Sequence, residues 1–432
     1  MSTFNFYKHQ PEIAEKAVNI LKSRGLVYLA IEMRVGKTLI AMLAAEMLGV
    51  KNVIFLTKKK ALSSIRNDFT LAGFKYNITI LNYEQYPKNR NHYDLYILDE
   101  AHSLSTYPKP NKTVQLLQKD INNAYVIFLS GTPTPESFSQ IFNQLSVSIY
   151  SPFKMYASFY KWANDYVVVK QRVLQSGMRF NDYSNAKKED VLSAIEPYFI
   201  RYKQEDAGFK QVEIKEYIRF IDLNDEVLNF IHQIKIDKVI EVNGSKIIAD
   251  TPVKVLSKIH QLSSGTIKAD NKITVNKETG LITEVDGERF IIDDSKAQWI
   301  KEKFVGKKIA IYYNFIAEKE AIQKTIPNTT ESPDEFNQST DKVFISQIQS
   351  GSMGVNLSTA EYLIFYNINF SATHYWQARA RMQDINRTTP SRIVYLFSNQ
   401  GIESKVYDTV KNKKDFTLAH FRKLEKEIKQ VA

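Results

Sequence analysis

The sequence predicts an α/β protein made of two tandem domains, each a parallel β-sheet flanked by helices. In the first third of the chain, apolar runs of strand length alternate with amphipathic stretches of helix length, the pattern of a parallel sheet covered by helices. The same alternation returns near residue 295. A length of 432 residues suits two or three domains of ordinary size, which excludes a single small domain.

The first domain is expected over residues 1–145. Its predicted strands lie in the apolar runs LVYLAIEM, NVIFLT, ITIL, DLYILDEAH and AYVIFLSGTP. Segments with helical periodicity, such as TLIAMLAAEML and KKALSSIRNDFTLAG, lie between these runs. Strands and helices therefore alternate through the domain.

Residues 146–290 are less regular, and we expect an insert region of helices and hairpins there. The text SPFKMYASFYKWANDY is helical and rich in aromatic residues, which favours buried core over an exposed base-stacking wedge. A second helical stretch, NDEVLNFIHQIKIDKVI, follows. The alternating segment 266–292 contains ETG and DGE, so it predicts one or two β-hairpins.

The second domain is expected over residues 291–432. Its predicted strands lie in KIAIYYNF, KVFISQIQ, YLIFYNINF and SRIVYLFS, and its helices in KAQWIKEKF, AEKEAIQKTI and THYWQARARM. A terminal helix is expected to follow the last strand.

Composition limits the class of protein. The formal net charge of +11 favours a polyanionic partner, because Lys and Arg that neutralise phosphates release counterions. The absence of cysteine excludes disulfides, thiolate zinc sites and cysteine nucleophiles. No uncharged apolar run reaches the ~20 residues of a membrane span, and the start of the chain lacks the apolar core of a signal peptide. We therefore expect no membrane association and a cytoplasmic protein.

The stretch IEMRVGKTLIAML has most of a phosphate-binding loop. Gly36, Lys37 and Thr38 match the last three positions of the GxxxxGK[ST] pattern, in which backbone N–H groups, a lysine and a hydroxyl hold phosphates and Mg²⁺. Ile31 stands where the first glycine is usual, and Arg34 replaces a small residue. Taken alone, the stretch is either an ATP site or an ordinary buried helix start.

Two further strand ends carry polar groups. Asp99 and Glu100 close the run YILDE, where one carboxylate suits a Mg²⁺ shell and the other an attacking water. Ser130 and Thr132 of FLSGTP follow the next predicted strand. Each motif is weak alone, since DEAH arises by chance and SGTP is also an ordinary turn.

The order of the motifs is more specific than any one of them. The loop, the acidic pair and SGTP are followed by SGSMGVNLSTA (350–360) and YWQARARMQDINRTTP (375–390). This ordered set resembles superfamily 2 helicases, most closely the Swi/Snf-type branch, whose loop typically reads DEMGLGKT without the first glycine. The compact chain is also similar to phage and bacterial branch-migration helicases. The resemblance implies two RecA-like domains with ATP held between them.

The resemblance also implies roles for individual residues. It assigns Gln10 of FYKHQ to adenine, Thr38 and Asp99 to Mg²⁺, Glu100 to the attacking water and Arg381 to the γ-phosphate. Gln377 of the same last motif is counted with the catalytic residues. The nucleotide-binding set implied in this way is Gln10, Arg34, Val35, Gly36, Lys37 and Thr38. The residues implied to couple the ATP site to the neighbouring surface are His102, Ser130 and Thr132. The residues implied to contact nucleic acid are Thr57, Lys58, Asn82, Tyr83, Ser346 and Asn356.

One departure concerns the last motif, which in the family runs Q-x-x-x-R-x-x-R-x-G-Q. Gln377 and Arg381 match it, but Asp384 stands at the second arginine. Spacing does not decide whether Arg379 or Arg387 takes over that role.

The resulting prediction is an ATP-dependent DNA helicase or translocase that acts on branched or forked DNA, with ATP and Mg²⁺ as cofactors. DNA contacts should be mostly independent of base sequence, and a monomer in a bacterial or phage-infected host cytoplasm is expected. The alternatives are a double-strand translocase that does not separate strands, an RNA helicase, and a degenerate ATPase that only clamps nucleic acid.

Overall fold

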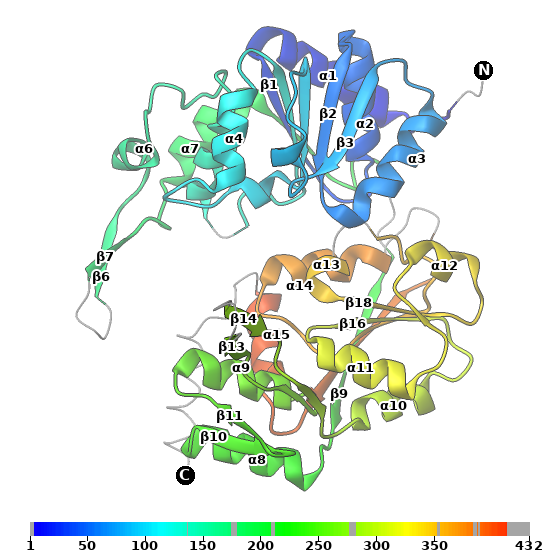
Figure 1. The fold of residues 1–432 in the computed structure, drawn as a ribbon. Helices are drawn as coiled ribbons and strands as arrows, with labels where there is room; N and C mark the ends of the chain where they lie inside the picture. Colours follow the sequence, from blue (N-terminus) through cyan, green and yellow to red (C-terminus); the bar gives the residue numbers. More distant parts are fainter. Residues whose placement is uncertain are drawn as a thin grey trace. The chain divides into compact units, whose positions relative to one another are not determined.

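The computed structural model of the chain forms two compact units, Met1–Gln211 and Val212–Ala432, which are described one at a time. Each unit contains a six-stranded sheet with helices on its faces (Figure 1). The structure describes residues 4–135, 137–173, 179–208, 212–275, 282–351, 355–382, 387 and 389–412. Within these ranges every helix is too short or too polar to cross a membrane.

The sheet of the first unit is parallel throughout, in the order β3-β2-β4-β5-β1-β8. Its central strands are buried on both faces, which explains why their sequences are continuous runs of apolar residues. Because all strands run the same way, the loop after β1 and the polar ends of β2, β4 and β5 share one edge of the sheet. The strands are β1 (Leu26–Ile31), β2 (Asn52–Thr57), β3 (Asn77–Asn82), β4 (Leu95–Asp99), β5 (Tyr125–Leu129) and β8 (Phe199–Tyr202).

Two clusters of apolar side chains cover the two faces of this sheet. One cluster includes buried residues of α1, α2 and α3, and α1 packs directly on α2. The other contains the predicted aromatic helix, in which Phe159 and Trp162 are buried, so the interpretation as core is confirmed. The helices are α1 (His9–Arg24), α2 (Lys37–Leu48), α3 (Leu62–Ala72), α4 (Lys112–Asp120), α5 (Ile141–Leu145), α6 (Phe159–Tyr166) and α7 (Lys188–Ile195).

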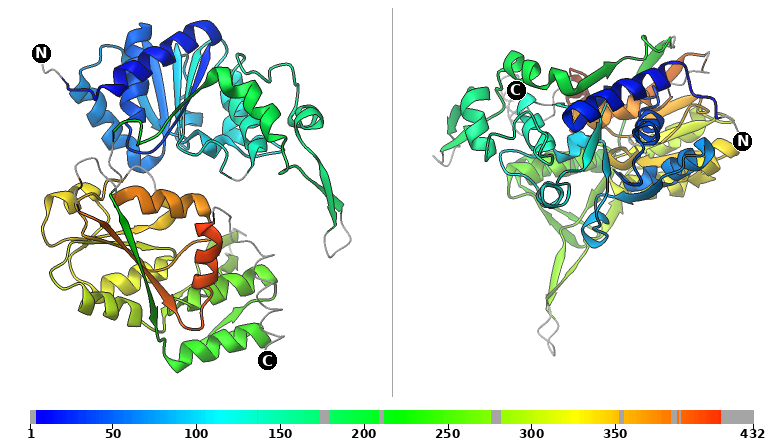
Figure 2. Two further views of the ribbon diagram at one scale, coloured as in Figure 1. Left: turned by 180° about the vertical axis from the view of Figure 1, so that it is seen from behind. Right: turned by 90° about the horizontal axis from the view of Figure 1, so that it is seen from above.

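The sheet of the second unit is also parallel, in the order β17-β18-β16-β19-β20-β9. Its strands are β9 (Ile214–Ile221), β16 (Ile309–Tyr313), β17 (Thr329–Thr330), β18 (Val343–Gln347), β19 (Tyr362–Phe365) and β20 (Ser391–Ser398). Its helices are α8 (Asp225–Ile236), α9 (Pro252–Leu262), α10 (Ser295–Lys303), α11 (Ile316–Thr325), α12 (Pro333–Gln338), α13 (Ile348–Gly351), α14 (Ala372–Arg379) and α15 (Glu403–Lys411). Figure 2 shows α14 and α15 beside the same sheet.

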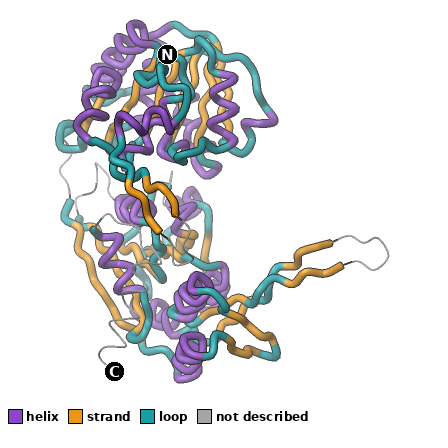
Figure 3. Tube along the Cα trace, turned by 90° about the vertical axis from the view of Figure 1, so that its left-hand side faces the viewer, coloured by secondary structure: helices purple, strands orange, loops and turns teal. Residues whose placement is uncertain are grey.

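Antiparallel strand pairs lie outside both large sheets. The predicted hairpins in 266–292 are confirmed as β12 paired with β15 and, between them, β13 paired with β14. Figure 3 draws all strands, including these pairs, as orange stretches of the tube. They are β6 (Lys170–Val173) with β7 (Arg179–Asp182), β10 (Val239–Val242) with β11 (Ser245–Ile248), β12 (Thr266–Lys268) with β15 (Arg289–Ile291), and β13 (Lys272–Val275) with β14 (Ile282–Val285).

The structure divides the expected insert region 146–290 between the two units. β8 is the edge strand of the first sheet, and β9 pairs with β20 along its whole length as the edge strand of the second. Most side chains of β9 are exposed or half-buried, and its text IKEYIRFI contains charges. An edge strand of this kind lacks the apolar run by which the central strands are recognised.

Candidate nucleotide site and nucleic-acid surface

The loop between β1 and α2 has the backbone shape of a phosphate cradle. Gly36 has a φ of 93°, and Arg34 before it has a φ of 69°. This φ favours glycine at position 36, where the space beside the Cα is filled by Nε2 of the Gln10 side chain. The N-cap of α2 is Gly36 itself, which has no side chain that could cap the first turn. The loop and the helix start therefore fit an anion.

Helix α1 fixes this loop from one side. The carbonyl oxygen of Val35 accepts hydrogen bonds from His9 Nε2 at 2.9 Å and from Gln10 Nε2 at 3.5 Å. Oε1 of Gln10 accepts a bond from the backbone N–H of Tyr7 at 3.0 Å. The His9 ring stacks on Tyr7 and on Tyr202, with centroids 5.9 Å and 5.6 Å apart. Sequence reasoning did not single out His9, whose only signal is its position next to Gln10.

The segment after β8 fixes the same loop from the other side. The backbone N–H of Gln204 donates to Oε2 of Glu32 at 3.0 Å, and its Nε2 donates to the carbonyl of Met33 at 2.7 Å. The N–H of Glu32 donates to the carbonyl of Tyr202 at 3.0 Å. Gln204 belongs to the stretch YFIRYKQED, but no pattern identified it as a contact of the loop.

The acidic pair stands at the end of β4, beside the loop. The hydroxyl of Thr57 donates to Oδ2 of Asp99 at 2.7 Å, and the hydroxyl of Tyr83 donates to the Asp99 carbonyl at 2.7 Å. Burial, and then the Glu100 carboxylate, raise the pKa of Asp99 to about 6, while the Thr57 bond and the Lys37 ammonium lower it in part. A cation bound at Asp99 would oppose this rise.

Lys37 extends from α2 toward the ends of the central strands. Its Nζ donates to the carbonyl of Ile31 at 3.0 Å, and Gly131 lies beside it, since an added Cβ there would be in ordinary contact with Nζ at 3.8 Å. Thr38 occupies the next position in the first turn of α2. The loop, the lysine and the acidic pair therefore lie together at one edge of the sheet.

The predicted coupling residues form a continuous chain of contacts. Nδ1 of His102 lies 3.3 Å from Oε2 of Glu100 and 3.0 Å from Oγ of Ser130. Oγ of Ser130 also accepts a bond from the backbone N–H of Thr132 at 3.1 Å. Burial lowers the pKa of His102, although the Glu100 carboxylate acts in the opposite direction. A neutral imidazole therefore joins the acidic pair to the SGTP segment.

In the second unit, Gln377 and Arg381 are both buried, on α14 and on the turn that follows it. The backbone carbonyl of Arg381 accepts a bond from the N–H of Leu357 at 3.2 Å. Oε1 of Gln377 has no hydrogen-bond partner among the described residues. Asp384 lies outside the described residues.

The other two arginines of this segment are engaged within the second unit. Arg379 Nε donates to Oε1 of Glu216 at 3.0 Å, and its guanidinium lies 5.0 Å from the ring centroid of Trp376. Arg387 donates through NH1 to the carbonyls of Ser358 at 2.8 Å and Ala360 at 3.0 Å. Both guanidinium groups therefore hold local structure within the second unit.

The predicted nucleic-acid contacts differ in accessibility. Asn356 is exposed and Lys58 is half-buried, so both can meet a ligand at the surface. The hydroxyls of Thr57 and Tyr83 are turned to Asp99, as described above. The buried members of the set are Thr57, Asn82, Tyr83 and Ser346.

The acidic and histidine side chains of the described residues limit the kinds of metal site that are possible. No group of three or more acidic or histidine side chains that could hold a metal occurs among them. A Mg²⁺ ion in a nucleotide site needs only one or two protein ligands, because phosphates and water supply the rest. The pair Thr38 and Asp99 fits that smaller requirement.

Comparison with known proteins finds relatives that match most of this chain. The curated relatives include the DNA repair and recombination protein RAD26 of Saccharomyces cerevisiae, 22% identical over 340 residues, and the DNA excision repair protein CSB of Oryza sativa subsp. japonica, 21% identical over 346 residues. Each alignment covers 72% of this chain but only 30% and 27% of the relatives. The chain thus spans less than a third of their length.

Among solved structures, the Sulfolobus solfataricus SWI2/SNF2 ATPase core in complex with dsDNA is similar at 15% identity, with a TM-score of 0.41 over 95% of this chain and 91% of that one. The model of the SNF2-related domain matches residues 50–266, half of the chain, and this range includes the acidic pair and the SGTP segment. The chain belongs to the SNF2-related family.

Proposed function

We propose that this chain is a DNA-dependent ATPase that moves along duplex DNA and remodels branched or forked DNA. The observation that carries the proposal is the contact of His102 with both Glu100 and Ser130, because it connects a hydrolytic carboxylate to a segment outside the phosphate cradle. An enzyme that only hydrolysed ATP would not need this connection. A motor needs it, because the state of the nucleotide must reach the surface that holds the track.

The residues of the first unit have separate tasks in this proposal. The loop N–H groups and Lys37 bind the phosphates, and the buried Gln10 contacts the base. Thr38 and Asp99 would hold Mg²⁺, which neutralises phosphate charge when bound. Glu100 orients the attacking water and accepts its proton. Arg381 of the second unit supplies positive charge to the γ-phosphate in the transition state.

DNA as the partner is supported by two observations. The net charge of +11 suits a polyanion. The names of the relatives RAD26 and CSB refer to DNA repair. The relatives named here are eukaryotic, so the finer likeness to phage and bacterial branch-migration helicases has no support among them, and action on branches is our own extension.

Phosphate release with and without duplex DNA tests the proposal directly. We expect turnover to rise severalfold with duplex DNA of any sequence and to stop when Mg²⁺ is chelated. Turnover that is indifferent to DNA, or that responds only to RNA, would contradict the proposal.

A second measurement separates the two modes of action. Displacement of a third strand from a triplex reports movement along a duplex, whereas release of a strand from forks and Holliday junctions reports remodelling of branches. Triplex displacement without junction processing would establish the translocase that does not separate strands.

A further inference from the structure

The strand pair β6–β7 extends away from the body of the first unit (Figure 1). Its register pairs Lys170 with Asp182, Arg172 with Phe180, and residue 173 with Arg179. Because opposite residues share a face, basic groups lie on both faces of the pair. The described strand side chains are exposed except for that of Asp182, which is half-buried. We call these two strands the β6–β7 ribbon.

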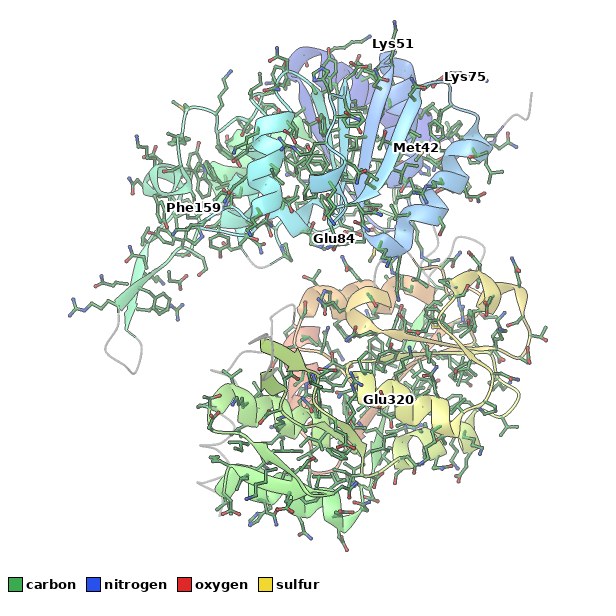
Figure 4. All side chains as sticks on the ribbon, in the orientation of Figure 1. Met42, Lys51, Lys75, Glu84, Phe159 and Glu320 are labelled. Atoms are coloured by element: carbon green, nitrogen blue, oxygen red, sulfur yellow. The ribbon has the colours of Figure 1, made fainter. Side chains whose placement is uncertain are left out.

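The base of the ribbon is held firmly by the first unit. The N–H of Val168 donates to the carbonyl of Asn185 at 2.9 Å, and Oγ of Ser137 donates to the carbonyl of Ser184 at 2.6 Å. The ring of Tyr183 packs against the buried ring of Phe159, with centroids 5.4 Å apart. Phe159 is labelled beside the start of the ribbon in Figure 4. The ribbon is therefore a preformed projection, and a ligand need not order its base.

The composition of the ribbon is not explained by folding. A two-stranded pair gains little from packing and is marginal by itself. Its charged residues are Lys170, Arg172 and Arg179 against the single acid Asp182. Nε of Arg172 donates to Oδ2 of Asp182 at 2.6 Å, so the excess positive charge is carried by Lys170 and Arg179. The ring of Phe180 is 43% exposed next to them.

We propose that the β6–β7 ribbon binds duplex DNA through Lys170 and Arg179, with the backbone phosphates as their ligands. The major groove accepts a two-stranded ribbon, and positive side chains on both faces can then reach phosphates on both walls. These two contacts carry no information about base sequence, because their ligands are backbone phosphates. This inference rests on the proposed function, and it names the surface by which the first unit binds the DNA along which it moves.

The position of the ribbon also gives it a route to the nucleotide. Oγ of Ser139 donates to the carbonyl of Tyr183, and Ser137 contacts Ser184. Both serines follow closely after Thr132, whose N–H is bonded to Ser130. The base of the ribbon is thus attached to the continuation of the SGTP segment that His102 contacts.

The test uses the full chain and two matched double variants. Lys170→Glu with Arg179→Glu reverses two charges on the ribbon. Lys51→Glu with Lys75→Glu makes the same change in net charge at exposed sites on the opposite edge of the first unit, where Figure 4 labels both lysines. Affinity for a short fluorescent duplex is measured by anisotropy from about 50 to about 200 mM salt, together with DNA-free ATP turnover.

We expect the ribbon variant to bind the duplex at least about tenfold more weakly, with DNA-free turnover unchanged. The variant Lys170→Ala with Arg179→Ala should lower the slope of log affinity against log salt by about 2, one for each lost phosphate contact. The Lys51 and Lys75 control should stay within about threefold of the wild type, since it alters only the overall field. An equal loss in both charge-reversal variants would overturn the inference.

A direct contact measurement makes the outcome independent of stability. p-Benzoylphenylalanine in place of Phe180 should crosslink to the duplex, whereas the same group in place of Leu71, which is 52% exposed on α3, should not. Failure of the proposed function appears separately, as wild-type turnover that DNA does not stimulate. If the wild type binds DNA and is stimulated by it, but the ribbon variant binds equally well, only the proposal about the ribbon is contradicted. A preference for RNA, or no duplex binding at all, defeats it too.

Discussion

His102 Nδ1 lies 3.3 Å from Oε2 of Glu100, and both side chains are almost withdrawn from solvent. Because burial lowers the pKa of His102, the imidazole is neutral at ordinary pH and can act as a hydrogen-bonded link rather than as a charge. The same atom also contacts Ser130. These two contacts of His102 therefore connect Glu100, the residue expected to activate water, with the segment that leads toward the ribbon.

Removing this link should uncouple hydrolysis from DNA. In His102→Ala we expect DNA-free turnover within a few-fold of the wild type, while the ratio of DNA-stimulated to DNA-free turnover falls at least about fivefold. Ser130→Ala should change the ratio in the same direction. The exposed His232 on α8 provides the control His232→Ala, which should keep the full ratio. Equal losses of both rates in His102→Ala would instead show a general defect of the site.

Substitution of Lys37 and of Glu100 should impair the nucleotide site in different ways. Lys37→Ala should abolish turnover and weaken ATP binding, because it removes positive charge from the phosphates. Glu100→Gln should keep ATP binding within a few-fold and lose turnover by at least about 10²-fold, because only the group that accepts the proton of water is lost. Nucleotide affinity and single-turnover rates distinguish the two, and near-normal turnover in either variant would refute its assignment.

Two arginines of the last motif, Arg381 and Arg387, should differ in what their removal affects. Arg381→Ala should lower kcat by at least about 10²-fold with ATP affinity nearly unchanged, because its charge acts mainly in the transition state. Arg387→Ala should instead lower the melting temperature, since its bonds to the carbonyls of Ser358 and Ala360 are lost, at a cost of about 1–3 kcal/mol. A large kcat loss in Arg387→Ala with an unchanged melting temperature would reverse these roles.

A buried ion pair offers a test of the second unit alone. Nζ of Lys296 lies 2.8 Å from Oε1 of Glu403, and both side chains are fully buried. Lys296→Met should destabilise the unit by about 3–5 kcal/mol, because it leaves an unpaired buried carboxylate. The double variant Lys296→Met with Glu403→Leu should recover much of this loss. Denaturant unfolding measures both, and a double variant less stable than the single one would show that the pair is worth more than an apolar contact.

Stability should fall in acid because of His260. Burial lowers the pKa of His260 to about 4, although the hydrogen bond with Asn367 opposes the change. The unfolded chain takes up this proton below about pH 6.5 and the folded chain only near pH 4, so stability is lost as pH falls through that window, by up to about 3 kcal/mol. Burial raises the pKa of the nearby Glu318, which contributes with the opposite sign.

His260→Gln isolates the contribution of the histidine. Its free energy of unfolding should vary less between pH 6.5 and 4 than that of the wild type, while Glu318 contributes equally to both proteins. Parallel pH profiles for the two proteins would show that His260 does not cause the acid sensitivity.

Contiguous motifs allowed most of the first site to be predicted. Gly36, Lys37, Asp99 and Glu100 are adjacent in pairs at the ends of buried strands, and a parallel sheet necessarily brings such ends to one edge. The contacts of His9 and Gln204 with the loop could not be predicted, because they join segments far apart in sequence through backbone carbonyls that any residue could supply.

The limits of domain prediction have a different cause. β8 and β9 are short or partly exposed edge strands, so their sequences contain no continuous apolar run. Such strands do not indicate from sequence where one unit ends and the next begins. The strands of the β6–β7 ribbon were not predicted from the sequence for a related reason. Its strands face water on both sides, and periodicity marks only strands with one buried face.

The hydrogen bond between Gln204 and Glu32 spans 172 positions of the chain. A loop that depends on so distant a partner acquires its final shape only when the last strand of its sheet has docked, and such long-range closure is slow. During synthesis the cradle sequence emerges early, but its clamp emerges with β8. We therefore expect a ribosome-bound fragment that ends before Phe199 to bind a fluorescent ATP analogue poorly. Nascent chains would then consume no ATP until the first unit is complete.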